Sequence, residues 1–496
     1  MSPGGRTAWV LGDQLSLDNP ALEGAERVLL VESEAKLRSG RFHRQKLHLM
    51  LSAMRHFAAG LEDRGVAVDY HRAATMRAGL ADHVREFAPD EVVLLEPTSA
   101  AGRDALGALP RVRLLEGSLF LTDAGEFADW AAGRERLVME DFYRRQRRRL
   151  GVLMDGNEPA GGRWNFDEDN RQRAPRDARP PSVYRPREDE IDVAVRRDLD
   201  ALSLQTFGDD APRRWPATRE QALRALRRFV EERLPDFGRW QDAMLHGERS
   251  LWHSLLSSSL NLGLLSPLEC VEAAEHAYRS GAAPIAAVEG FVRQLIGWRE
   301  YVWCLYRLRE REWGRMNALR AQAPLPEVLW GGPTEMRCVG DAVGGLRETA
   351  YAHHIERLML FGNLVLLLGV HPRAALDWFH HAFIDGYEWV MAPNVLGMAT
   401  FADGGRMMTK PYAAGGRYVQ RMSDHCGGCR YRPDRRTGDD ACPFSTLYWD
   451  FLDRNRERLA GNHRMRIAYR NLDAIDRGEL DEIRRRGRAL RREFRA

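Results

Sequence analysis

The sequence predicts an α/β amino-terminal domain with a Rossmann-like parallel sheet, followed by a long linker and a large all-α domain. Short β-branched runs alternate with amphipathic segments over about the first 135 residues. A stretch rich in Gly, Pro and Arg then shows no periodicity, and beyond about residue 215 the apolar spacing is helical. A chain of 496 residues can bury two or three cores, so a single small domain is excluded.

The amino-terminal sheet is predicted from apolar, β-branched runs at residues 7–11, 28–31, 66–70, 92–95 and 112–115. Between them, residues 43–62 and 76–87 carry apolar side chains three and four positions apart, as helices do. This alternation favours a parallel sheet, whose ligands bind beyond the carboxyl ends of its strands. The first strand delivers Gly12-Asp13 there, which could equally be an ordinary turn. No GxGxxG or P-loop motif follows, which disfavours a Rossmann dinucleotide site.

The middle of the chain contains a basic run and then a predicted linker. Residues 142–149 predict a basic helix that is either a solvated face or a surface for phosphate or another domain. Residues 155–186 are rich in Gly, Asn, Asp, Arg and Pro and predict the linker. We therefore expect an α/β domain over 1–135, a basic helix and linker over 136–215 and a helical domain over 216–496. Its predicted helices cover 217–234, 268–279, 285–312, 347–369 and 372–385.

The composition restricts the class of protein. The net charge is only +3, and the basic residues are nearly all Arg, the exceptions being Lys36, Lys46 and Lys410. Because Arg binds phosphate through two hydrogen bonds, a basic face can be built within a nearly neutral chain. No run of eighteen uncharged apolar residues and no signal-peptide pattern is present. We expect a soluble, cytoplasmic protein without a membrane partner.

The cysteine pattern predicts a metal site. Three cysteines lie close together in a Gly- and Asp-rich stretch, at Cys426, Cys429 and Cys442. Two cysteines separated by two residues can ligate one metal, and Pro443 after a cysteine is typical of ferredoxin-like clusters. Cys338, in a loop-like stretch over 331–345, is the best fourth ligand, because the other two cysteines lie in helical patterns. A zinc knuckle uses the same spacing, so the metal is open at this point.

A charged and histidine-containing segment is the second chemical signal. His353 and His354 precede Arg357 by one turn in an otherwise apolar segment, and Asp385 follows 28 residues after Arg357. A histidine in such a segment is more often a core residue than a catalyst. Two successive histidines cannot share a helix face, however, so one can be structural while the other points into a cavity.

These motifs resemble the photolyase and cryptochrome family, and specifically its bacterial iron-sulfur (6-4) photolyases. The resemblance runs over nearly the whole chain, and its segments include residues 11–16, 53–57, 162–166, 297–301, 352–355, 387–389, 401–405, 410–413 and 421–424. It implies a light-dependent DNA repair lyase that acts on UV-damaged DNA. Such an enzyme reverses pyrimidine-pyrimidone (6-4) photoproducts by electron transfer from photoexcited, reduced FAD. We expect it to be a monomer associated with the nucleoid.

The resemblance also implies cofactors. A 4Fe-4S cluster would be held by Cys338, Cys426, Cys429 and Cys442. FAD would be bound in the helical domain by His253, Ser254, Leu255, Leu256, Ser257, Asn261, Gln294, Arg299, Arg357 and Asp385. The first five match a Thr-Ser-x-Leu-Ser phosphate-binding turn, with His in place of Thr, and hydroxyls and amides at a helix start suit a diphosphate. An antenna, 6,7-dimethyl-8-ribityllumazine, would contact Asp13 and Glu32, although Lys36 stands where a carboxylate is common.

Roles in electron transfer and in catalysis follow from the same resemblance. Trp378 and Trp330 match an electron-transfer chain toward the surface, with Tyr418 as a further member. His354 matches the histidine that faces the lesion and donates a proton, with His353 as the alternative donor. Its neighbours would be Tyr412 and Leu358 as pocket walls and Lys410 as a phosphate or lesion contact. Met391 falls near flavin N5, where many relatives carry Asn.

Two alternatives share part of this pattern. A cryptochrome-type blue-light receptor would have the same fold and flavin without repair activity. A light-independent, nucleic-acid-binding iron-sulfur protein, such as a primase large subunit, would use a four-cysteine cluster in a helical domain without flavin. Repair of defined lesions distinguishes a photolyase from the light receptor, which has no repair activity. Flavin absorbance distinguishes it from the nucleic-acid-binding protein, which has no flavin.

Overall fold

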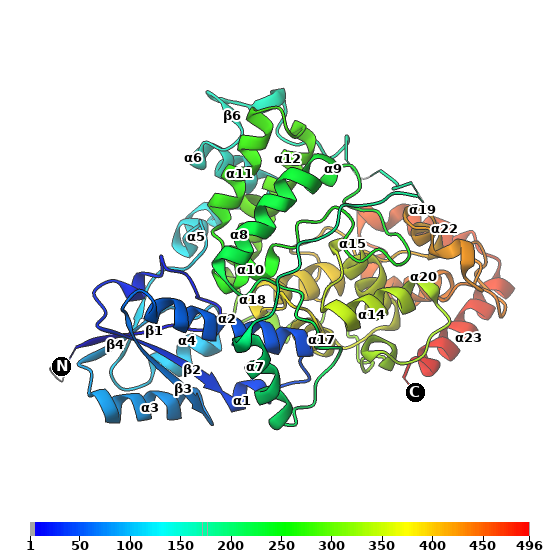
Figure 1. Cartoon of the computed structure of the whole chain (residues 1–496). Coiled ribbons are helices and arrows are strands. Elements are labelled where there is room, and N and C mark those ends of the chain that lie inside the picture. Colours follow the sequence, from blue (N-terminus) through cyan, green and yellow to red (C-terminus); the bar gives the residue numbers. More distant parts are fainter. Residues whose placement is uncertain (1–4, 171, 176, 496) are drawn as a thin grey trace.

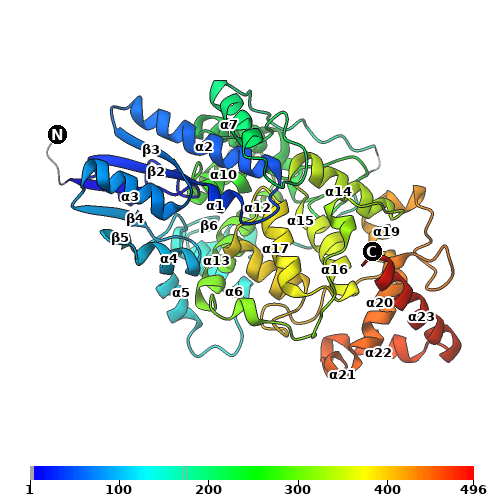
Figure 2. The same cartoon turned by 90° about the horizontal axis from the view of Figure 1, so that it is seen from below.

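A computed structural model describes residues 5–170, 172–175 and 177–495. An amino-terminal sheet with helices is followed by a helical region, which confirms the predicted fold class (Figure 1). Seen from below, the sheet lies at one end of the molecule and α20 to α23 lie at the other (Figure 2). No helix of the described ranges is long and apolar enough to cross a membrane.

The sheet has five parallel strands in the order β3-β2-β1-β4-β5. The strands are β1 (Arg6–Trp9), β2 (Arg27–Ser33), β3 (Ala67–Ala73), β4 (Glu91–Leu95) and β5 (Val112–Leu115). Helices α2 (Arg44–Glu62) and α3 (Met76–Phe87) pack on opposite faces, because alternate side chains of β2 join different clusters. Leu30 lies in the cluster with Leu47 of α2, and Leu29 lies in the cluster with Leu80 of α3. All five strands and both helices were predicted.

The remaining elements before residue 215 are short apart from two helices. They are η1 (Pro20–Leu22), α1 (Glu34–Leu37), α4 (Ala100–Gly107), α5 (Ala124–Ala131), α6 (Met139–Leu150), β6 (Met154–Asp155), β7 (Glu158–Pro159), η2 (Ala160–Gly162) and α7 (Glu190–Ala201). The predicted basic helix is α6, but it is only partly a solvated face. Arg147 is fully buried and donates to the backbone oxygen of Trp164 at 2.9 Å.

The helical region follows. Its elements are α8 (Arg219–Arg228), η3 (Phe229–Arg233), α9 (Leu234–Phe237), α10 (Ser257–Leu262), α11 (Pro267–Arg279), α12 (Ile285–Val292), η4 (Arg293–Arg299), α13 (Glu300–Leu308), η5 (Trp313–Arg315), η6 (Glu327–Trp330), α14 (Arg337–Thr349), α15 (His354–Glu356), η7 (Arg357–Gly362), α16 (Asn363–Leu368), α17 (Pro372–Ala382), α18 (Glu388–Met391), η8 (Ala392–Ala399), α19 (Gly416–Met422), η9 (His425–Gly428), α20 (Pro443–Arg454), α21 (Arg456–Leu459), η10 (His463–Met465), α22 (Arg466–Asp473) and α23 (Arg477–Glu493). Four of them, η3, η4, η7 and η8, are π-helical turns, which occur frequently at functional sites.

Several helix predictions were wrong in detail. The helix predicted over 347–369 is broken, because α14 ends at Thr349, the next residue Ala350 has a left-handed φ of 59°, and α15 starts only at His354. The helix predicted over 285–312 is interrupted by η4 and ends at Leu308. The helix predicted over 372–385 ends at Ala382, because Phe383 is extended. Asp385 therefore lies in a turn, and this turn builds the site.

Candidate functional site

The centre of the site is an ion pair between Arg357, at the start of η7, and Asp385, in the turn after α17. Arg357 Nη1 donates to Asp385 Oδ1 at 2.8 Å, and Nη2 donates to Oδ2 at 3.1 Å. Ser257 Oγ donates to the same carboxylate at 2.7 Å, and Asn261 Nδ2 donates to the backbone oxygen of Asp385 at 3.2 Å. Burial alone raises the pKa of Asp385, but the charge and hydrogen bonds of Arg357 outweigh it, so the pKa is lowered. Four predicted FAD residues thus meet around one carboxylate.

A cavity with an empty volume of about 840 Å³, part of it open to solvent, lies beside this pair. Ser254 and Leu255 of the predicted phosphate-binding turn line it, and Leu255 has a left-handed φ of 59°. Its lining includes one carboxylate, Glu348, and five arginines, which are Arg185, Arg214, Arg228, Arg233 and Arg249. This excess of positive charge suits a polyanionic ligand.

Of two buried nitrogens in this region, one supports the same interpretation. Arg233 Nε and His253 Nε2 have no hydrogen-bond partner among the described residues. Arg233 is 3% exposed and donates to the backbone oxygens of Pro181 and Ser250, both at 3.2 Å. Burial lowers the pKa of Arg233 to about 10. Since unsatisfied buried donors are costly, Arg233 Nε, which belongs to a residue of the cavity lining, fits a bound diphosphate or its ribose, whereas His253 does not line the cavity.

Aromatic rings complete the cavity. Trp215 and Tyr351 both line it, and their ring centroids lie 5.7 Å apart. The guanidinium of Arg357 lies 5.2 Å from the centre of the Tyr351 ring, which connects the ion pair to the cavity wall. A dinucleotide has two flat ring systems, and aromatic side chains beside cationic groups suit such a ligand. The residues present therefore fit FAD.

The other predicted FAD residues lie elsewhere. Leu256 is buried at the start of α10. Gln294 and Arg299 both belong to η4 and do not line the cavity. Gln294 donates to the backbone oxygen of Gly290 at 3.0 Å, while Arg299 lies 4.1 Å from the ring centre of Phe120.

Lys46 is a residue of this site that sequence reasoning missed. It comes from α2, and its Nζ donates to the backbone oxygens of His380 at 2.5 Å and of Gly386. These two carbonyls bracket Asp385, so a side chain of the amino-terminal region holds the turn that carries the carboxylate. Burial lowers the pKa of Lys46 to about 7, partly offset by the charge of Asp385. The only signal in the sequence was the rarity of lysine, which occurs at three positions.

The two adjacent histidines point in different directions. His353 is fully buried before α15, and its ring nitrogens have no hydrogen-bond partner among the described residues. Its ring stacks on that of His253, and burial lowers its pKa well below the ordinary value. His354, the first residue of α15, is exposed. Only His354 can therefore reach a molecule on the protein surface.

The other predicted lesion-side residues differ in their exposure. Leu358 belongs to η7 and is 8% exposed, and Tyr412 is half-buried against the core cluster that includes Leu358. Lys410 is exposed. The backbone near Tyr412 is fixed, because the Asn363 amide exchanges hydrogen bonds of 2.9 and 3.0 Å with the backbone of Ala414.

The four predicted cluster cysteines line one small cavity. Cys338 lies in the first turn of α14 and not in the predicted loop, Cys426 lies in η9, Cys429 follows it, and Cys442 precedes α20. Burial and the neighbouring thiols raise the pKa of Cys426 to about 12. Thiols packed in this way ionise when a metal cation is beside them. A Cβ on Gly416 would lie 2.7 Å from Cys442 Sγ, so only glycine leaves this space open.

The arrangement of the sulfurs allows two kinds of metal site. Among the described residues, the sets of three ligand atoms that lie within 4.8 Å of one another do not include these cysteines. Thiolates around one tetrahedral zinc lie about 3.8 Å apart. Four thiols around one cavity can hold either a single tetrahedral metal ion or a multi-iron cluster. Cys270 and Cys304, as expected, are buried in α11 and α13.

The predicted electron-transfer tryptophans are neighbours. The ring centroids of Trp330, at the end of η6, and Trp378, in α17, are 6.5 Å apart. Trp378 is 1% exposed and its Nε1 donates to the backbone oxygen of Leu329 at 3.1 Å, whereas Trp330 is half-buried. The pair thus leads from the core toward the surface. Tyr418 lies on α19, and its neighbour Val419 lines the cysteine cavity.

The two antenna candidates have different surroundings. Asp13 follows β1 and accepts a hydrogen bond from Thr98 Oγ1 at 3.0 Å. Burial and then the charge of Asp13 raise the pKa of Tyr387, so Asp13 lies near the helical region. Glu32 is bound within its own domain, because Arg55 donates to both of its oxygens at 2.8 and 3.0 Å. Asp13 therefore lies beside the helical region, whereas Glu32 is held by Arg55.

Known proteins match this chain along its length. A family model described as deoxyribodipyrimidine photo-lyase-related protein matches residues 8–215. A (6-4) photolyase of Agrobacterium fabrum is 42% identical over 502 residues, which cover 98% of this chain and 99% of that protein. An uncharacterized protein of Acanthamoeba polyphaga mimivirus is 30% identical over 110 residues, covering 22% of this chain and 82% of that protein.

The fold has a match among solved structures as well. The crystal structure of a bacterial class III photolyase from Agrobacterium tumefaciens has a TM-score of 0.59 and 16% sequence identity. The match covers 99% of this chain and 98% of that chain. By its sequence identity over nearly its full length, the chain belongs to the photolyase family of lyases, together with the (6-4) photolyase of Agrobacterium fabrum.

Proposed function

We propose that this chain is a (6-4) photolyase, which uses blue light to reverse pyrimidine-pyrimidone (6-4) photoproducts in DNA. The observation that carries the proposal is the position of two residues on one short segment. Arg357 pairs with Asp385 and lies against Tyr351 of the cavity lining, and His354, three residues earlier, is exposed. One segment therefore connects a cofactor site inside the protein to a proton donor on the protein surface.

The helical region would bind FAD through the residues around the cavity. The arginines of the lining would bind the diphosphate, with Ser254 and Leu255 at the turn beside it. The pair of Arg357 and Asp385 would lie beside the isoalloxazine, with further contacts made by His253, Leu256, Ser257 and Asn261. Gln294 and Arg299 stay predicted contacts, because they do not line this cavity. When bound, reduced FAD supplies a light-driven electron to the lesion.

His354 would act as the proton donor. Repair of a (6-4) product moves a hydroxyl or amino group between two bases, so a proton donor is needed beside the lesion. Histidine donates near neutral pH. The lesion must leave the base stack to come close to the flavin, and Tyr412 and Leu358 would form the walls that receive it. Lys410 and surface arginines would bind phosphates, and these contacts would dominate affinity over sequence readout.

Further cofactors and electron carriers belong to the same proposal. Cys338, Cys426, Cys429 and Cys442 would hold a 4Fe-4S cluster, which their position around one cavity supports. Trp378 and Trp330, with Tyr418 as a further member, would deliver electrons for photoreduction. A lumazine antenna would bind near Asp13. The chain would work as a monomer with units at 1–135, 136–215 and 216–496.

Illumination of the purified protein with defined lesions tests the proposal. One oligonucleotide carries a (6-4) product and a second carries a cyclobutane dimer, and both are also incubated in the dark. We expect blue light to restore the (6-4) oligonucleotide and darkness to leave it unchanged. Flavin absorbance with no repair of either lesion would favour a light receptor. Iron absorbance without flavin after mild purification would favour a light-independent nucleic-acid-binding protein.

A further inference from the structure

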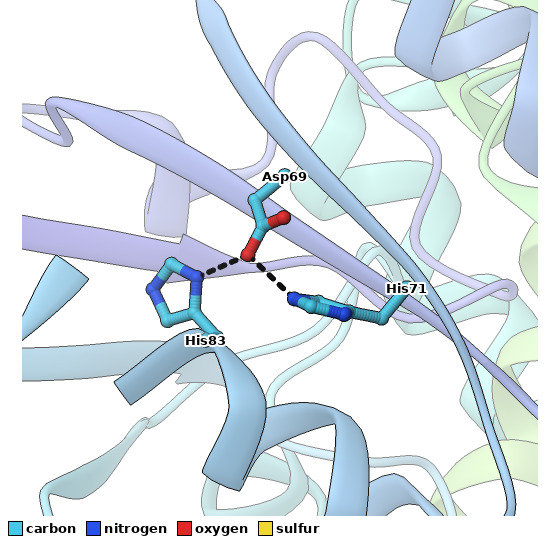
Figure 3. A group of neighbouring side chains, drawn as sticks. All are labelled: Asp69, His71 and His83. Atoms are coloured by element: carbon cyan, nitrogen blue, oxygen red, sulfur yellow. Dashed lines mark hydrogen bonds and ion pairs between the residues drawn. The ribbon is translucent and has the colours of Figure 1, made fainter. Parts of the chain in front are cut away.

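A second group of metal-type ligands lies at the edge of the amino-terminal sheet, in residues that the proposed function does not use (Figure 3). Asp69 and His71 belong to β3, the edge strand, and are two residues apart, so their side chains share one face of the sheet. His83 belongs to α3, which covers that face. Figure 3 shows both imidazole rings directed at the carboxylate of Asp69.

The distances within this group are short. Asp69 Oδ2 lies 2.6 Å from His83 Nδ1 and 2.8 Å from His71 Nε2. One ligand atom of each residue lies within 4.8 Å of the other two. The side chain of His83 is fully buried, whereas those of Asp69 and His71 are 13% and 20% exposed. Solvent therefore reaches the group from the side of His71.

Thr7 of β1 orients the buried histidine. Its Oγ1 lies 3.0 Å from His83 Nε2, on the opposite side of the ring from Asp69. A hydroxyl can both donate and accept a hydrogen bond. The Thr7 hydroxyl can thus donate to His83 Nε2 while the Nδ1–H of His83 donates to Asp69. When Nδ1 instead gives its lone pair to a metal, the hydroxyl can accept from Nε2–H. Metal-ligating histidines almost always have such a partner on the second nitrogen.

We propose that Asp69, His71 and His83 form a binding site for a divalent transition metal ion, and that zinc is the ion they suit best. Two imidazoles and one carboxylate leave a fourth tetrahedral position for water, and the exposed side of the group provides it. Zinc at about 2.0–2.1 Å from each ligand separates the ligand atoms to about 3.3 Å, so they must move apart by about half an ångström. Each metal-facing nitrogen that now donates to Asp69 would give up its N–H, and the proton can move to the other nitrogen of the same ring.

The role of this ion would be structural. β3 pairs with only one strand, β2, and the ion would tie it to α3 through side chains of both elements. An edge strand held in this way exchanges its amide hydrogens more slowly. Asp69, His71 and His83 do not line the cavity, so zinc binding would leave flavin content unchanged.

Zinc titration of the full-length protein tests this proposal. We expect calorimetry with ZnCl₂ to show one saturable site that His71→Phe and Asp69→Asn each weaken by about 10-fold or more, as loss of a ligand does. His276→Ala, which removes an exposed histidine of α11, is the matched control and should titrate like wild type. Zinc taken up by the cysteines appears equally in all four proteins and cancels in the comparison. Identical isotherms for wild type and His71→Phe would overturn the proposal.

Hydrogen exchange of the wild-type protein gives an answer that does not depend on the variants folding. Zinc should slow exchange in residues 67–73 and 76–87 relative to the same protein without zinc. Exchange in 91–95, a strand outside the site, should not change. Equal exchange of residues 67–73 with and without zinc would also overturn the proposal.

Discussion

His353 stacks on His253 with their ring centroids 5.0 Å apart and an angle of 7° between the ring planes. This contact joins the predicted phosphate-binding turn to the residue before α15. Burial lowers the pKa of His253 to about 3, so both rings stack as neutral imidazoles at neutral pH. The stack fixes the backbone at His353, and the next residue, His354, consequently faces outward.

The first prediction concerns Asp385. Asp385→Asn should reduce the flavin bound per protein by about tenfold or more, because it leaves the buried Arg357 without its charged partner, which costs about 3–5 kcal/mol. Asp377→Asn, which breaks the exposed pair of Arg373 and Asp377 on α17, is the matched control and should retain flavin. The ratio of flavin to protein absorbance is the readout. Full flavin content in Asp385→Asn would show that the pair does not support the cofactor.

The second prediction concerns the cysteine cavity. Cys429→Ala should give insoluble or flavin-poor protein, because the energy of metal binding also stabilises the fold and ties the loop with Cys426 to α14. Cys304→Ala changes a buried cysteine outside the cavity and is the control. It should lower the free energy of unfolding only as an ordinary core truncation does. Iron and flavin content are measured on both proteins. Soluble Cys429→Ala with normal flavin and no iron would show that the cluster is dispensable.

The third prediction concerns pH. Glu356 is 5% exposed, and burial raises its pKa to about 8. Because the folded state holds this proton more tightly than the unfolded chain, its contribution to stability is complete below about pH 4.5 and is lost as pH rises through about 8. Between pH 6 and pH 9, the free energy of unfolding of wild type should fall by about 2–3 kcal/mol more than that of Glu356→Gln. Urea unfolding at both pH values measures this, with the exposed Glu62→Gln as control. Parallel pH profiles for wild type and Glu356→Gln would contradict it.

The fourth prediction concerns photoreduction. Trp330→Phe should slow the light-driven reduction of oxidised flavin, because it removes the half-buried ring next to Trp378 while keeping the packing. Trp130→Phe, which changes a tryptophan of similar exposure on α5, is the control, and its flavin should be reduced at the wild-type rate. Flavin absorbance under blue light with an external reductant follows both reactions. Equal rates in wild type and Trp330→Phe would exclude this tryptophan from the pathway.

The sequence allowed prediction of the sheet and of most helices because their apolar spacing is regular. It did not reveal the break at Ala350, because a left-handed alanine leaves no mark on that spacing. Cys338 was predicted in a loop because its stretch is rich in glycine, yet it lies in α14. Packing overrides that propensity, since a Cβ on Gly345 would lie 2.7 Å from the side chain of Arg249.

The candidate site was predictable where the resemblance to photolyases supplied its residues. Ser257, Asn261, Arg357 and Asp385 were all identified and do meet. Lys46 was not, because its carbonyl partner Gly386 is 340 residues away and a backbone oxygen has no sequence signature. Glu32 was predicted as an antenna contact, but Arg55 binds both of its oxygens.

The central claim is that His354 and the flavin pocket act together in (6-4) repair, and repair by His354→Ala tests it most directly. The variant should keep flavin and photoreduction, since His354 is exposed, while repair of a (6-4) oligonucleotide under blue light falls by about 100-fold or more. Wild-type repair by His354→Ala, together with loss of repair in His353→Ala, would assign proton donation to His353 instead. Wild-type repair by both variants would contradict the account.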